Sequence, residues 1–139
     1  LKNNIISGYY IMKSNVIINL IITAILFISI DSIYLKLISP LFNSLIYSIQ
    51  GKSIKLRLDG IIVAYLCIIA VFNYFILYKE GTILDAFILG FLTYGIYEGT
   101  NRAIFTNWTA DVMIIDTIWG GVLFSIVFVL YNLIQRKIF

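Results

Sequence analysis

The chain has 139 residues, of which 61% are hydrophobic and 12% are charged, and its formal net charge is +3. Soluble domains are about half apolar and about a quarter charged, so this composition is typical of an integral membrane protein and gives no reason to expect a nucleic-acid partner. Cys67 is the only cysteine and histidine is absent, which excludes an intrachain disulfide, a His-ligated zinc or haem site and a His-based catalytic triad.

Four stretches are long and apolar enough to be tested as membrane spans, since a hydrocarbon core of about 30 Å needs about 20 helical residues. They cover residues 15–39, 60–78, 82–101 and 110–135. The first ends at Pro40, the only proline, which we expect to terminate the helix. The third is the weakest, because it carries Asp85 and Glu98. Backbone groups in lipid must be satisfied internally. The sequence therefore predicts an all-α, multi-pass membrane protein built as a four-helix bundle, without indicating which membrane it occupies.

The connecting segments carry further signals. Between Pro40 and Gly60, apolar residues recur at helical spacing beside polar ones, which favours an interfacial helix. The basic residues that follow it either contact anionic headgroups or form a solvated loop. Residues 79–81 predict a tight turn, and Thr82 with Asp85 has the spacing of a capping box.

Residues 1–11, which precede Met12, are polar and turn-like, and we expect an extraneous or disordered extension there, with a single membrane domain over 12–139. In the predicted topology the ten basic residues divide equally between the two faces, so the excess of Lys and Arg that marks cytoplasmic loops does not choose an orientation.

Three acids are the informative exceptions, because an unpaired charge inside a membrane costs about 2.5 to 3.5 kcal/mol. If the first helix ends near Ser39, Asp31 lies roughly 12 Å and Asp116 roughly 9 Å below the loop-bearing face, at 1.5 Å per residue. Glu98 lies near the same face. We therefore expect three acids from three helices to converge on one side of the bundle.

Helical spacing adds neighbours to these acids. Tyr94, Tyr97, Glu98 and Asn101 follow the i, i+3, i+4, i+7 rule, and Asp116 shares a face with Trp119 and Gly120. Simpler interpretations stay open: Glu98 pairs with Arg102 one turn later, Asp111 complements the start of its helix, and Gly95 with Gly99 allows a close helix approach.

The segments YGIYEGTNRAIFTNW, from Tyr94 to Trp108, and DTIWG, from Asp116 to Gly120, resemble the predicted membrane protein family known as domain of unknown function 2177. Gly90, Thr100 and Ala103 also match the pattern of that family, while Glu98 stands where an aspartate is usual. Asp31, Tyr34 and Leu35 correspond to the acid, aromatic and leucine of its first span, with Tyr34 in place of the more usual tryptophan. The resemblance implies a four-span membrane protein and names no reaction, substrate or cofactor.

The candidate site is a polar cluster that binds a substrate, with no catalytic residue and no metal ligand assigned. It comprises Asp31, Tyr94, Tyr97, Glu98, Thr100, Asn101, Trp108, Asp116 and Trp119.

Three functions are compatible with this cluster. The first is binding or transport of a cation, proton or small solute, since carboxylates without histidine suit protons and hard cations. The second is an enzyme that acts on a lipid or isoprenoid at the interface. The third is a structural or assembly protein, with a homo-oligomer or another membrane protein as partner.

Overall fold

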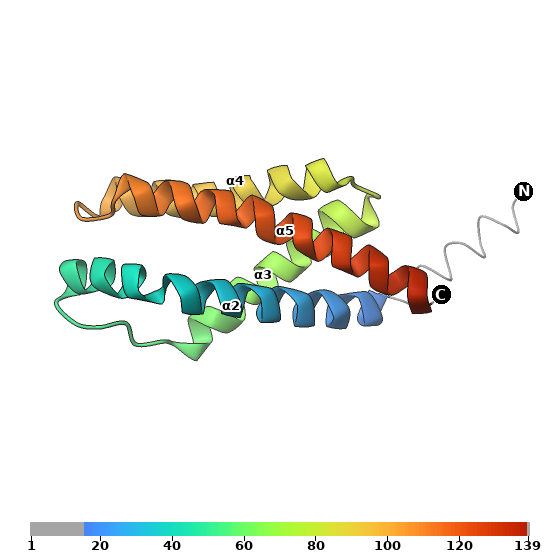
Figure 1. Ribbon diagram of the computed structural model, residues 1–139, viewed down its shortest axis with the longest axis horizontal. Coiled ribbons are helices and arrows are strands. Elements are labelled where there is room, and N and C mark those ends of the chain that lie inside the picture. The colour runs from blue at the N-terminus through green and yellow to red at the C-terminus, as the bar shows by residue number, and fades with distance from the viewer. Residues whose placement is uncertain (1–15, 139) are drawn as a thin grey trace, which may run out of the picture.

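The computed structural model describes residues 16–138, and all its regular elements are helices. In chain order these are α2 (Val16–Gln50), α3 (Leu58–Phe72), the π-helical segment η1 (Asn73–Tyr78), α4 (Ile83–Ile104) and α5 (Ala110–Ile138). Figure 1 shows α4 alongside α5, α2 on the other side of α5, and α3 running obliquely behind them. The all-α four-helix prediction is confirmed, whereas the extension expected over 1–11 lies outside the described residues.

The prediction that the first helix ends at Pro40 is wrong, because α2 continues through this proline to Gln50. The separate interfacial helix expected after Pro40 is therefore replaced by the last turns of α2. An interior proline removes one helical hydrogen bond and costs about 3 kcal/mol. Packing offsets this cost, since Leu45 is buried against Trp108 and Val112.

The loop after α2 turns back along the helix it has just left (Figure 1). The backbone N–H of Ile54 donates to Oδ1 of Asn43, over 3.0 Å, and this bond holds the loop against α2. At the other end of the bundle, a turn at Lys79 and Glu80 leads into α4. The predicted capping box is confirmed there: Asp85 N–H donates to Oγ1 of Thr82, and Thr82 N–H donates to the Asp85 carboxylate.

Three segments are long and apolar enough to cross a membrane by length and composition: α2, the α3–η1 unit of 21 residues, and α5. This agrees with the predicted multi-pass membrane protein. The helix α4 does not meet the same criterion, although its 22 residues extend about 33 Å, enough for a hydrocarbon core of about 30 Å. A crossing by α4 stays a prediction. By contrast, the 35 residues of α2 extend about 52 Å, so this helix is longer than the core is thick.

The closest helix packing joins α4 and α5, and two glycines permit it. A Cβ at Gly90 would overlap the carbonyl oxygen of Gly120 and approach Cγ of Phe124 to 2.7 Å. A Cβ at Gly120 would overlap the ring of Tyr94. The close approach expected at Gly95 and Gly99 is only partly present: Gly95 faces the side chain of Thr117 at 3.3 Å, while Gly99 faces open space.

Two separate hydrophobic cores fill the bundle. The larger one is centred on Phe27, Phe72 and Phe124, whose rings meet edge to face with centroids 5.0–5.8 Å apart. The smaller one consists of Leu45, Trp108 and Val112, at the end where α4 passes into α5. The acids predicted from the sequence lie on the helices between these two cores.

Candidate functional site

Three acidic side chains are buried inside the bundle. Asp31 is 6% exposed, Asp116 is 5% exposed and Glu98 is completely enclosed. They come from α2, α5 and α4 respectively, so the tertiary structure brings three helices to one polar layer, which we call the acid layer. Because a buried polar group must find hydrogen-bond partners, the donors around each acid define what the layer can do.

Asp31 accepts two hydrogen bonds, one on each carboxylate oxygen. Tyr65 donates its hydroxyl to Oδ2 over 2.8 Å, and Trp119 donates its indole N–H to Oδ1 over 2.9 Å. Tyr65 lies on α3 and Trp119 on α5, so this one carboxylate joins three helices. With a donor on each oxygen, Asp31 is well satisfied as an anion.

Asp116 lies on the same helix as Trp119 and is bound from α2. The hydroxyl of Tyr34 donates to its Oδ1 over 2.9 Å. The ring of Tyr34 also stacks on Trp119, with centroids 4.1 Å apart and planes 9° from parallel. Tyr34 on α2 thus binds Asp116 on α5, and Trp119 on α5 binds Asp31 on α2. The stacked pair therefore locks α2 and α5 in register.

Glu98 is held by Trp108 from the short loop between α4 and α5. The indole N–H of Trp108 donates to Oε2 of Glu98 over 2.6 Å, while the backbone carbonyl of the same tryptophan accepts from Arg102. The ion pair suggested by the i, i+4 spacing of Glu98 and Arg102 is not formed. Trp108 instead connects Glu98 and Arg102, since its indole N–H donates to the acid and its carbonyl accepts from the guanidinium.

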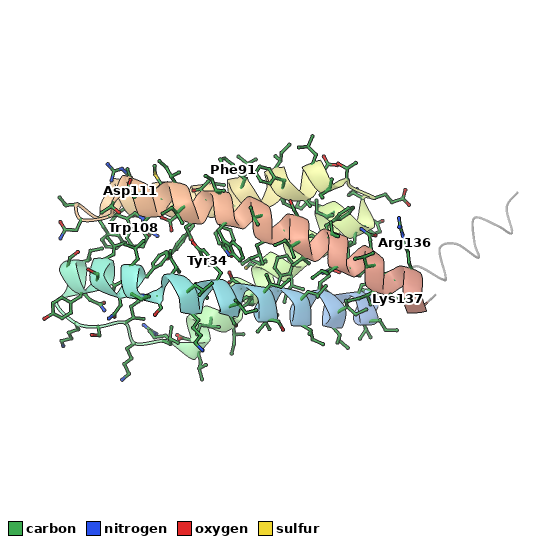
Figure 2. All side chains as sticks on the ribbon, in the orientation of Figure 1. Tyr34, Phe91, Trp108, Asp111, Arg136 and Lys137 are labelled. Carbon is green, nitrogen blue, oxygen red and sulfur yellow. The ribbon has the colours of Figure 1, made fainter. Side chains whose placement is uncertain are left out.

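The acid layer is extended along the bundle. Figure 2 shows Trp108 near the α4–α5 loop and Tyr34 farther towards the middle, both between the α2 side and the α5 side of the molecule. Trp108 binds Glu98 at the loop end, while Tyr34 binds Asp116 and Trp119 binds Asp31. The α4–α5 loop is level with Leu45, which Trp108 contacts, and not with Ser39. The depth of 12 Å expected for Asp31 is thus an underestimate, because α2 does not end where the prediction placed its end.

The remaining predicted residues do not all join the layer. Tyr94 is partly buried against the larger core, and Asn101 is partly buried with an Nδ2 that lacks a hydrogen-bond partner. Tyr97 is 57% exposed, and Thr100 is exposed and donates its hydroxyl to the backbone of Ile96 in its own helix. Among the described residues no hydrogen bond joins Tyr97 or Thr100 to an acid, but the ring of Tyr97 meets that of Trp108 edge to face, with centroids 6.4 Å apart.

Two donors to the acids are missing from the predicted site. Tyr34 is three residues after Asp31 and thus on the same helix face, a spacing that could have identified it. Tyr65 lies within an apolar span with no charged neighbour, and only the tilt of α3 across α2 brings its hydroxyl to Asp31. No pattern in the sequence indicates that contact.

No basic side chain compensates the acid layer. Within residues 16–138 the single ion pair joins Arg57 to Asp59, and both are exposed. The described part of the chain also contains no group of three His, Cys, Asp or Glu side chains placed to hold a metal ion. Two grooves open elsewhere on the surface, one beside Lys79 and Asp85 and one beside Ser48 and Asn107, and neither is lined by the three acids. The layer is a closed, anionic site with neutral donors.

A second polar layer lies beyond the larger core, away from Trp108. Asn73, the first residue of η1, donates to Oγ1 of Thr23 on α2 and to the carbonyl of Ile69, both over 2.8 Å. Gln135 on α5 donates to Oδ1 of Asn19, over 3.2 Å. These bonds satisfy the side-chain amide of Asn73, and the phenylalanine core separates this layer from the acids.

A comparison with known protein families gives a match to the family described as "Predicted membrane protein (DUF2177)" over residues 16–131. The match begins at the first residue of α2 and includes the whole acid layer. Neither a curated protein nor a solved structure matches the sequence.

Proposed function

This chain belongs to the predicted membrane protein family DUF2177, and from that premise we propose that it binds a small cation, a proton or a small polar solute at the acid layer as a step in transport. One observation carries the proposal. Asp31, Glu98 and Asp116 are buried together, and no lysine or arginine within residues 16–138 forms an ion pair with them. An uncompensated charge in a medium of low dielectric constant is expensive, so such a cluster favours binding of a positive species.

The two hydrophobic cores add to the proposal. One core lies on each side of the acid layer, and both must open or loosen before an ion can pass. A site closed on both sides corresponds to the occluded state of a transporter, in which access alternates between the two faces. The ring cluster of Phe27, Phe72 and Phe124 would then act as the barrier on the side of the acid layer away from Trp108.

The experiment compares two Asp→Asn variants of α5. Asp116→Asn removes a buried charge of the acid layer, while Asp111→Asn makes the same change at an exposed position five residues earlier. Purified proteins are reconstituted into liposomes, and the movement of protons and of monovalent cations is followed with fluorescent indicators. We expect flux in the wild type and in Asp111→Asn, and its loss in Asp116→Asn. Absence of flux in the wild type, or equal flux in all three proteins, would contradict the proposal.

A second function is favoured by the hydrogen bonds themselves. Each acid accepts a hydrogen bond from another helix or from the α4–α5 loop. The layer is therefore also suited to fixing the bundle for assembly with another membrane protein. In that case, neutralising the acids should break up the fold or its complexes. A monodisperse monomer that keeps its fold after Asp31, Glu98 and Asp116 are all neutralised would argue against this second function.

A further inference from the structure

One oxygen of the acid layer has no donor. Oε2 of Glu98 accepts from Trp108, but Oε1 is buried and has no hydrogen-bond partner. The side chain is completely enclosed, so solvent does not supply one. A buried, unsatisfied carboxylate oxygen costs more than a neutral group would, because a charged acceptor loses strong hydration. This atom therefore indicates a missing positive or hydrogen-bonding species.

One group that can complete Glu98 is another acid. The carboxyl groups of Glu98 and Asp116 lie close enough to interact across the α4–α5 contact. Two ionised carboxylates have only acceptors and repel each other, so a hydrogen bond between them requires that one carries a proton. The unpartnered Oε1 and the adjoining acid thus point to the same species.

The other titratable groups around the pair do not supply a positive charge. Asp31, Tyr34 and Lys36 lie on α2, Tyr65 on α3, and Tyr94 and Arg102 on α4. Tyr34 and Tyr65 are neutral donors that are already bound to acids, and Lys36 is exposed on the surface. Arg102 donates to the backbone of Trp108. Metal cations require several oxygen ligands, whereas only Oε1 of Glu98 is free here. A proton is therefore the positive species that fits this enclosed site.

We propose that Glu98 and Asp116 form a carboxyl–carboxylate pair that binds one proton between them inside the membrane protein. The inference rests on the proposed function and names its ligand. Asp31 does not compete for this proton, because Tyr65 and Trp119 already provide a donor for each of its oxygens. When the proton is bound, one member is a neutral acid that donates to its ionised partner. When it leaves, the pair carries two negative charges and α4 is repelled from α5.

Infrared spectroscopy tests the pair directly, because a protonated carboxyl group has a C=O stretching band distinct from that of a carboxylate. The full chain in lipid nanodiscs should show this band at neutral pH, with a shift in heavy water. In Glu98→Gln the amide can donate to Asp116 in place of the proton, so the fold should persist while the band disappears. The band should also disappear in Asp116→Asn.

Three further variants serve as controls. Glu80→Gln makes the same change at an exposed turn position and should keep the band, and Asp31→Asn should keep it as well. If Glu98→Gln fails to fold, Glu98→Asp keeps the acid and should retain a displaced band. Absence of the band in the wild type, its persistence in both Glu98→Gln and Asp116→Asn, or its loss in Asp31→Asn alone would overturn the proposal.

The liposome assay separates this inference from the proposed function. A band that depends on Glu98 and Asp116, in a protein that moves no ion, would support the proton pair and overturn transport. Cation flux that depends on Asp116, in a protein without the band, would support transport and overturn the proton pair.

Discussion

Asp31 shows how a single side chain joins helices that are far apart in the sequence. Its two oxygens take donors from Tyr65 and Trp119, which are 34 and 88 residues away. Both donors are neutral, so the carboxylate is stabilised by hydrogen bonding and not by an ion pair. Removing one donor leaves a buried, charged acceptor unsatisfied, and this penalty exceeds the net value of the bond that is lost.

Tyr65→Phe isolates this effect, because it removes only the hydroxyl. We expect the free energy of unfolding in detergent micelles to fall by about 1–3 kcal/mol. Tyr47→Phe makes the same change at a tyrosine that is 58% exposed and should leave stability unchanged. Equal stabilities for the two variants, measured by thermal or chemical denaturation, would mean that the bond to Asp31 contributes nothing.

At the scale of the helices, the contact between α4 and α5 sets the position of the acid pair. Gly90 and Gly120 face each other across it, and both positions match the family pattern described above. Their lack of side chains lets the two backbones approach closely enough for Glu98 and Asp116 to be neighbours. The α4–α5 contact thus requires the two glycines, and it brings the two acids together.

Gly90→Ala should force α4 and α5 apart, because its Cβ would overlap the backbone of Gly120. We expect a loss of stability of about 2 kcal/mol or more, comparable with overpacking in a core. Gly99→Ala lies on the same helix with open space around it and should be neutral or more stable, since alanine favours a helix by about 1 kcal/mol. Melting temperatures in detergent give the comparison, and a Gly90→Ala protein as stable as wild type would contradict the proposed contact.

At the scale of the whole molecule, the helices alternate in direction, so the turn at Glu80 and the loop at Asn107 lie at opposite ends of the bundle (Figure 1). The helix α4 connects them. If α4 crosses the membrane, its two ends face different compartments. Its outer face carries exposed apolar residues such as Leu92 and Ile96, which suit contact with lipid, while Glu98 is turned inward.

Cysteine labelling tests the crossing by α4. In a Cys67→Ser background, single cysteines at Glu80 and Asn107 are treated in intact vesicles with a thiol reagent that does not cross membranes. We expect only one of the two to react until the membrane is opened. A cysteine at Ser53 should behave like the one at Asn107, because both positions lie in loops at the same end of the bundle. If the cysteines at Glu80 and Asn107 both react from one side, α4 does not cross the membrane and only three helices do.

The sequence by itself determined that this is a multi-pass membrane protein and approximately where its four helices lie, apart from the end of the first, because apolar length and the rarity of charge are local properties. It also drew attention to Asp31, Glu98 and Asp116, since any acid within an apolar span is costly wherever the chain goes. Only the tertiary structure decided how these acids are satisfied. The passage of α2 through Pro40, the tilt of α3 that brings Tyr65 to Asp31, and the choice of Trp108 over Arg102 as the partner of Glu98 all depend on packing between distant segments, whose energies outweigh local preference.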